Sequence, residues 1–130
     1  MSIEVHVVTP EREVWSGQAT MVIARGVEGE VGILSGHAPL LIRLAVGVLR
    51  IRQNGTQESA VVDGGFLHVT SQEGATRVDV LASRAEMASE IDLRAAAHRV
   101  EELRRRLGQK EDAGARAELA KAMARVQLAR

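Results

Sequence analysis

The hydrophobic residues of this chain change their spacing near residue 85, and this change most constrains the fold. Before that point, short runs rich in Val, Ile and Leu are interrupted by glycine. After it, glycine becomes rare and Ala, Glu and Arg dominate. Alternating apolar residues indicate strands, whereas apolar residues spaced by three and four indicate helices. The sequence therefore predicts two units, at residues 1–85 and 86–130.

The first unit has the pattern of many short strands. Ile3, Val5 and Val7 alternate with polar residues, and the pair Asn54-Gly55 is typical of a hairpin turn. Comparable runs and turns recur roughly every ten residues, which favours an antiparallel β-sandwich of about ten short strands. Aromatic residues make up 2% of the chain, so Val, Ile, Leu and Ala must fill the core.

The second unit has the pattern of two helices. Asp92 is expected to cap the first helix and Gly108 to end it. Because the connecting segment is short, the helices should pack as an antiparallel hairpin. The apolar stripes are narrow and rich in alanine, so the hairpin should be marginally stable alone and able to detach. The stripes comprise Leu93, Ala96, Ala97, Val100, Leu103 and Leu107, then Leu119, Met123 and Val126.

The charges are divided unevenly between the two units. The whole chain carries 17 Lys and Arg against 17 Asp and Glu, which argues against binding to nucleic acid. The second unit has a positive net charge, and its positive residues are densest at the tract Arg104-Arg105-Arg106. Two interpretations stay open for this tract: a solvated helix face, or a docking surface for an acidic partner.

The sequence contains no recognisable catalytic pattern. There are no cysteines, which excludes disulfides, thiol catalysis and thiolate zinc sites. The glycine-rich residues 26–36 lack the lysine of a phosphate-binding loop, and the four histidines lack metal-ligand spacing, so no metal is expected. No apolar run approaches the roughly 18 residues of a membrane span. A small enzyme with an unrecognised site is the least favoured interpretation.

Residues 32–42 combine turn formers with large apolar side chains. Leu40, Leu41 and Ile42 are expected to begin a buried strand. Ile33 and Leu34 lie between two glycines, and we expect them at a loop tip, where they would be exposed unless a partner covers them.

Four segments together resemble the epsilon subunits of F-type (rotary) ATP synthases. They are VTPEREVWSGQA at residues 8–19, GVEGEVGILSGHAPLL at 26–41, VDGGFLHV at 62–69 and VLASRAEMASEID at 80–92. The resemblance implies a non-catalytic part of the central stalk. Its sandwich would bind the gamma subunit and the c-subunit ring. Its hairpin would extend toward the alpha/beta catalytic head and oppose ATP hydrolysis.

The resemblance also implies interface residues. A c-ring interface would comprise Glu28, Gly29, Glu30, Gly32, Ser35, Gly36, His37, Ala38 and Pro39. Docking to the beta subunit would use Arg104, Arg105, Arg106, Lys121 and Arg125.

Some members of this family bind regulatory ATP through the pattern I-D-x-x-R-A. Here Ile91 and Asp92 match, but Arg94 comes one residue early. One residue turns a helix by about 100°, enough to point the guanidinium elsewhere. This displacement argues against ATP binding, and no other cofactor is expected.

The expected location is the cytoplasmic face of the bacterial plasma membrane, reached through the complex only; a plastid-encoded origin stays open. The alternative function is a free-standing β-sandwich adaptor domain with a helical tail, serving an unrelated partner.

Overall fold

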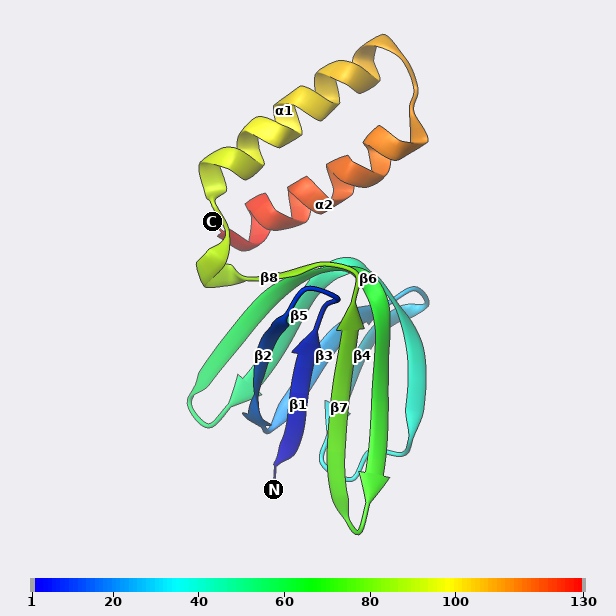
Figure 1. The fold of residues 1–130 in the computed structure, drawn as a ribbon, viewed down its shortest axis with the longest axis vertical. Coiled ribbons are helices and arrows are strands. Elements are labelled where there is room, and N and C mark those ends of the chain that lie inside the picture. The colour runs from blue at the N-terminus through cyan, green and yellow to red at the C-terminus, as the bar shows by residue number, and fades with distance from the viewer. Residues whose placement is uncertain (1, 130) are drawn as a thin grey trace.

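A computed structural model describes residues 2–129 as a β-sandwich with a helical hairpin across one end (Figure 1). The N-terminus lies at the opposite end of the sandwich, and the C-terminus lies near the junction of the two units. The elements are β1 (Ile3–Val8), β2 (Glu13–Ala19), β3 (Met21–Gly26), β4 (Gly29–Leu34), β5 (Leu40–Gln53), β6 (Thr56–Gln72), β7 (Ala75–Ala82), β8 (Ala85–Met87), the short 3-10 helix η1 (Ala88–Glu90), α1 (Leu93–Gln109) and α2 (Ala113–Ala129).

The predicted fold class is confirmed, with two refinements. The strands form one continuous path in the order β2-β1-β7-β6-β5-β3-β4, and β8 pairs with β6. Strands β5 and β6 have 14 and 17 residues, so each serves as two of the short strands that the sequence predicted. The pairing of β1 with β7 is parallel, whereas all other pairs are antiparallel.

Two glycines allow β6 to bend in its middle. The register with β5 passes from Leu44↔Gly65 to Val46↔Asp63, skipping one residue on each strand. Gly64 and Gly65 have φ values of +94° and +121°, a region that other residues rarely adopt. A Cβ on Gly65 would lie 2.1 Å from the Leu81 carbonyl oxygen. This crowding explains why only glycine fits at the bend.

The sandwich core is aliphatic, as the composition predicted. The fully buried side chains include Ile3, Ile51 and Leu67, and Trp15 packs partly against them. Met87 of β8 also belongs to this core, so the sandwich continues past residue 85, where the sequence placed the division.

The hairpin buries far less apolar surface. Its own cluster consists of Val100, Leu103, Ala115 and Ala122, of which only Leu103 is fully buried. The Asp92 Oδ1 atom accepts a hydrogen bond from the Ala95 amide at 3.0 Å, which confirms the predicted cap. Helix α1 continues through Gly108 to Gln109, one residue beyond the predicted end.

Two expectations for residues 32–42 were wrong. Ile33 is fully buried, because it lies within β4 opposite Val22 and its side chain points into the core. Leu41 is 64% exposed, because the alternation of β5 turns it away from the core. Leu34, in contrast, is 55% exposed, as expected.

Candidate interaction surfaces

The predicted c-ring residues lie along one edge of the sandwich rather than on a single loop. Glu28 lies in the turn between β3 and β4, and Gly29 and Glu30 begin β4, whereas residues 35–39 form the connection between β4 and β5. Strand β4 has six residues, so it separates these two connections by about 20 Å at about 3.4 Å per residue. In the described residues β4 pairs only with β3, so its other edge is open.

We call this edge the β4 ridge; its exposed members are Glu28, Gly29, Glu30, Gly32, Leu34 and Gly36. Residues 35–39 at one end of it are held by hydrogen bonds. The Gly36 amide donates to Thr76 Oγ1 at 2.8 Å, and the His37 Nδ1 atom lies 2.7 Å from the Ala38 carbonyl oxygen. Because the carbonyl can only accept, His37 carries its proton on Nδ1 in this arrangement. Ala38 and Pro39 are exposed, whereas Ser35 and His37 are half-buried.

A row of exposed apolar side chains crosses the outer face of β5, β6 and β7. Phe66 lies directly opposite Leu81 on the neighbouring strand, and Leu41 occupies a diagonal position on β5. Their exposed fractions are 46%, 50% and 64%. Sequence reasoning missed this apolar row, although the alternation of Phe66 with the core residue Leu67 was a usable signal. Large exposed apolar patches commonly mark protein interfaces.

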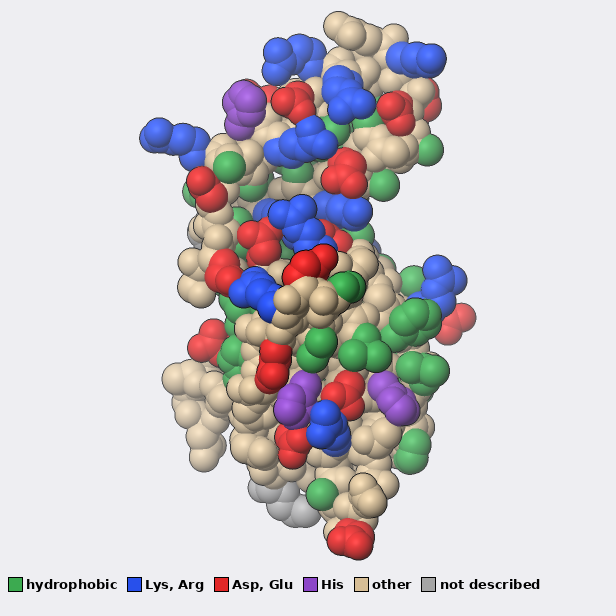
Figure 2. Space-filling view, viewed as in Figure 1, with side chains coloured by type: hydrophobic (Ala, Val, Ile, Leu, Met, Phe, Trp, Pro, Cys, Tyr) green, Lys and Arg blue, Asp and Glu red, His purple; other side chains and the backbone are tan. Residues whose placement is uncertain are grey.

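A polar row borders the apolar row on the same face. Asp79 of β7 lies between His6 of β1 and His68 of β6. Figure 2 shows histidines gathered with acidic and basic side chains on this face. The Nε2 atom of His6 lies 2.7 Å from a Glu4 carboxylate oxygen. No group of three or more His, Asp or Glu among residues 2–129 has the geometry to hold a metal.

The five predicted docking cations do not form one surface. Arg104, Arg105 and Arg106 are exposed on α1, and successive residues on a helix point about 100° apart. Lys121 and Arg125 lie on α2 and face the sandwich instead. Lys121 pairs with Glu118 at 3.3 Å.

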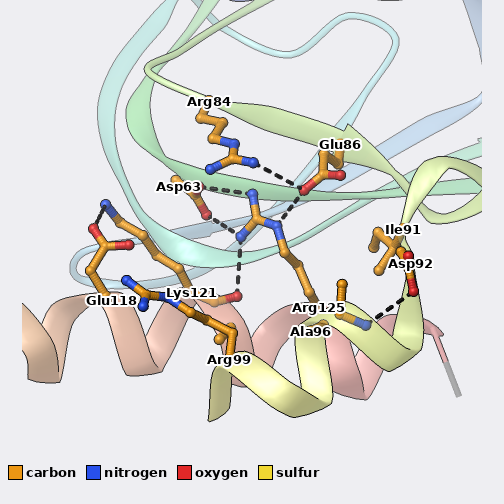
Figure 3. Close-up of a pocket in the computed structure, with 12 residues that line it drawn as sticks. Asp63, Arg84, Glu86, Ile91, Asp92, Ala96, Arg99, Glu118, Lys121 and Arg125 are labelled. Carbon is orange, nitrogen blue, oxygen red and sulfur yellow. Dashed lines mark hydrogen bonds and ion pairs between the residues drawn. The ribbon is translucent and has the colours of Figure 1, made fainter. Parts of the chain in front are cut away.

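Arg125 is buried, with 9% of its surface exposed, and its guanidinium binds two carboxylates of the sandwich. Its Nη1 and Nη2 atoms donate to the two oxygens of Asp63, both at 2.9 Å, and its Nε atom donates to Glu86 at 2.5 Å (Figure 3). Burial alone would lower the pKa of Arg125, but these hydrogen bonds outweigh it and raise the pKa. We call these three residues the junction cluster.

The junction cluster forms one wall of a cavity of about 320 Å³ between the hairpin and the sandwich (Figure 3). Ile91 and Asp92, predicted for nucleotide binding, line this cavity, whereas Arg94 is exposed and is not among its lining residues. Each cation of the lining already pairs with a carboxylate: Arg84 with Glu86, Arg99 with Glu102, Lys121 with Glu118, and Arg125 with Asp63 and Glu86. A phosphate group would have to displace these partners.

The segment between the sandwich and α1 is fixed by Glu90. Its carboxylate accepts hydrogen bonds from the Arg12 guanidinium and the Met87 amide, each at 2.9 Å. These bonds, the one from Arg12 first, lower the pKa of Glu90.

The fold and these surfaces define a class of small protein in which a β-sandwich with exposed apolar and polar surfaces carries a helical hairpin across one end. The family described as "ATP synthase, Delta/Epsilon chain, beta-sandwich domain" matches residues 2–88. The ATP synthase epsilon chain of Thermobifida fusca is 47% identical over 131 residues, covering 97% of this chain and 90% of the relative. The epsilon chain of Frankia casuarinae is 49% identical over 88 residues, covering 67% of this chain and 99% of the relative. This chain therefore belongs to the family of ATP synthase epsilon chains.

Solved structures agree with this assignment. A chain of the mitochondrial ATP synthase of Euglena gracilis, solved with OSCP, F1 and the c-ring, matches with a TM-score of 0.76 and 26% identity. The match covers 98% of this chain and 78% of that one. A central stalk/c-ring structure from Tetrahymena thermophila matches with a TM-score of 0.54 at 20% identity, which supports the fold alone.

As an epsilon chain, the protein is a non-catalytic subunit of a membrane-associated complex. Its described helices are too short or too polar to cross a bilayer.

Proposed function

We propose that this chain joins the gamma subunit to the c-subunit ring in the central stalk of a proton-translocating F-type ATP synthase. The epsilon-chain family supports this role, and the Euglena structure that it resembles contains both F1 and a c-ring. The observation that carries the proposal is the presence of two separate exposed surfaces on one rigid sandwich: the apolar row and the β4 ridge.

The apolar row suits the gamma subunit. Phe66, Leu81 and Leu41 lie together on paired strands, so they present a preformed surface that needs no rearrangement. Aromatic and aliphatic side chains of this kind supply most of the energy at protein interfaces. A rotor contact has to persist through rotation, which favours a surface of this type.

The β4 ridge suits the c-ring. Glu28 and Glu30 offer exposed carboxylates, and the neighbouring glycines let another backbone approach closely. The turn at residues 35–39 extends the contact at the other end of β4. Contacts spread over such an edge resist slipping better than one strong contact.

Co-purification of the full chain with gamma and the c-ring tests these assignments. Phe66→Asp should release the chain from gamma, and its control is Leu93→Asp, at an exposed apolar position of α1. Glu30→Arg should leave binding to gamma intact and weaken binding to the c-ring. Its control is Glu58→Arg, at an exposed position of β6. Retention of gamma by Phe66→Asp would contradict the proposed surface. Failure of the unmodified chain to bind gamma would instead favour the free-standing adaptor.

The hairpin is the proposed regulatory element, and it opposes ATP hydrolysis when it extends toward the alpha/beta head. Arg104, Arg105 and Arg106 are exposed for contact with the beta subunit, whereas Arg125 becomes available only when the hairpin leaves the sandwich. The proposed site of action is the cytoplasmic face of the bacterial plasma membrane, reached through the complex.

Truncation of the assembled complex tests regulation. Because β8 and Met87 belong to the sandwich and Glu90 binds Arg12, the cut should follow residue 90 rather than residue 85. Removal of the hairpin should raise the rate of ATP hydrolysis. An unchanged rate would overturn the regulatory role.

A further inference from the structure

The junction between the hairpin and the sandwich contains a cluster of charged side chains that is largely buried. The part of α2 that lines the 320 Å³ cavity carries Glu118, Lys121, Ala122 and Arg125. The apolar residues of the hairpin pack mainly against each other. Among the described residues, the hydrogen bonds between α2 and the sandwich are those of the junction cluster of Arg125, Asp63 and Glu86.

The sandwich holds its half of the cluster in place without the hairpin. The Asp63 amide donates to the Arg84 carbonyl at 2.9 Å, and the Asp63 carbonyl accepts from Ser83 Oγ at 3.0 Å. Glu86 is fixed on β8, which pairs with β6. Two carboxylates are thus positioned beforehand, and a guanidinium matches Asp63 with two parallel hydrogen bonds.

A contact of this kind specifies position more than it adds stability. When the hairpin leaves, water hydrates both Arg125 and Asp63, which offsets most of the lost attraction. When one partner is removed and the hairpin stays, the remaining charge is buried without a partner, which is costly. The junction cluster can therefore hold one geometry tightly and still release it.

We propose that the Arg125–Asp63–Glu86 cluster is a latch that holds the hairpin closed and withholds the Arg125 guanidinium from any acidic partner. The same guanidinium cannot bind Asp63 and a partner carboxylate together, so docking elsewhere requires the latch to open. The biological role of this latch rests on the proposed regulatory function, whereas its existence does not.

The open and closed populations of the full chain can be measured directly. The natural sequence has no cysteine, so Ser71→Cys and Gln109→Cys, both exposed, give a unique pair of label sites on the sandwich and on α1. Spin labels at these sites report the distance between the two units. Circular dichroism of each variant verifies that the sandwich stays folded.

Arg125→Met should raise the ratio of open to closed molecules by at least about tenfold, because it leaves the buried Asp63 carboxylate without its guanidinium partner. Asp63→Asn should raise this ratio less, because Glu86 still binds Arg125. The double variant, Arg125→Met with Asp63→Asn, should raise the open-to-closed ratio less than the product of the two single effects. In it, neither Arg125 nor Asp63 remains as a charge without its partner.

Arg116→Gln provides the matched control. Arg116 also lies on α2 and also binds a carboxylate through two hydrogen bonds, but its partner Glu111 is not on the sandwich. This variant should leave the distance distribution unchanged. The latch is overturned if Arg125→Met leaves the distances unchanged, or if Arg116→Gln opens the hairpin equally.

A separate arm distinguishes the latch from the regulatory role. In the assembled complex, Asp63→Asn should lower ATP hydrolysis by releasing the hairpin, and should have no effect after truncation at residue 90. If the labels show opening but hydrolysis does not change, the latch stands and the regulatory function fails.

Discussion

The sandwich and the helical hairpin are held together by different kinds of contact. The sandwich packs aliphatic side chains such as Ile51 and Leu67 to complete burial, and its long strands tie both layers into one path. The hairpin has one fully buried large side chain, Leu103, and meets the sandwich through the junction cluster. In the proposed function, the sandwich has to stay rigid and the hairpin has to move, and the two kinds of contact suit these needs.

The largest expected effect concerns the sandwich core. Leu67→Ala should lower the free energy of unfolding of the sandwich by about 2–5 kcal/mol, because it leaves a cavity in a fully packed site. Urea unfolding of the full chain measures this loss. Leu41→Ala, at a 64% exposed position, should change the free energy of unfolding by less than about 0.5 kcal/mol. Equal effects of the two variants would contradict the assigned core.

The second effect separates the two units. Leu103→Ala should destabilise the hairpin by about 2–3 kcal/mol, because it removes the centre of the small hairpin cluster. The helical circular dichroism should be lost at lower urea, while the unfolding midpoint of the sandwich stays the same. If both signals shift together, the hairpin and the sandwich form one cooperative unit, and the comparison fails.

The smallest effect concerns the connection between the units. The pKa of Glu90 is lowered below its ordinary value of 4.5, chiefly by the hydrogen bond from Arg12. The ionised carboxylate therefore stabilises the fold above about pH 4.5, and this stabilisation is lost as the pH falls through the lower folded pKa. Because both side chains are partly exposed, screening by solvent keeps this contribution small.

Glu90→Gln should accordingly destabilise the chain slightly at pH 7 and less at pH 3, because the contribution shrinks as the pH falls below about 4.5. Urea midpoints at the two pH values measure the difference. Glu58→Gln serves as the control, since Glu58 forms no ion pair in the described part of the chain. A penalty for Glu90→Gln that persists unchanged at pH 3 would argue against the ion pair with Arg12.

Local patterns in the sequence predict the strands and helices well, because alternation and helical spacing reflect which side chains are buried. The N-cap of Asp92 follows from the same local chemistry. The parallel pairing of β1 with β7 could not be predicted, because it joins segments distant in the sequence. Ile33 was misplaced because glycines on both sides resemble a turn, although here they lie in and beside a strand.

The burial of Arg125 is the clearest limit of the sequence pattern. A single arginine on an alanine-rich helix is usually exposed, and nothing near it in the sequence indicates a partner. Asp63 lies 62 residues away along the chain, and only the fold brings it to the guanidinium. The exposure of the tract Arg104-Arg105-Arg106 was predictable because arginines are rarely buried and three in a row cover most of the helix circumference.

Native-state hydrogen exchange of the full chain tests the difference between the two units most directly. Amides of α1 and α2 should exchange through an opening that costs clearly less free energy than the opening of β5 and β6, and low urea should not change this order. Exchange of all four elements at one common free energy would contradict the account, because the hairpin could not then leave a folded sandwich.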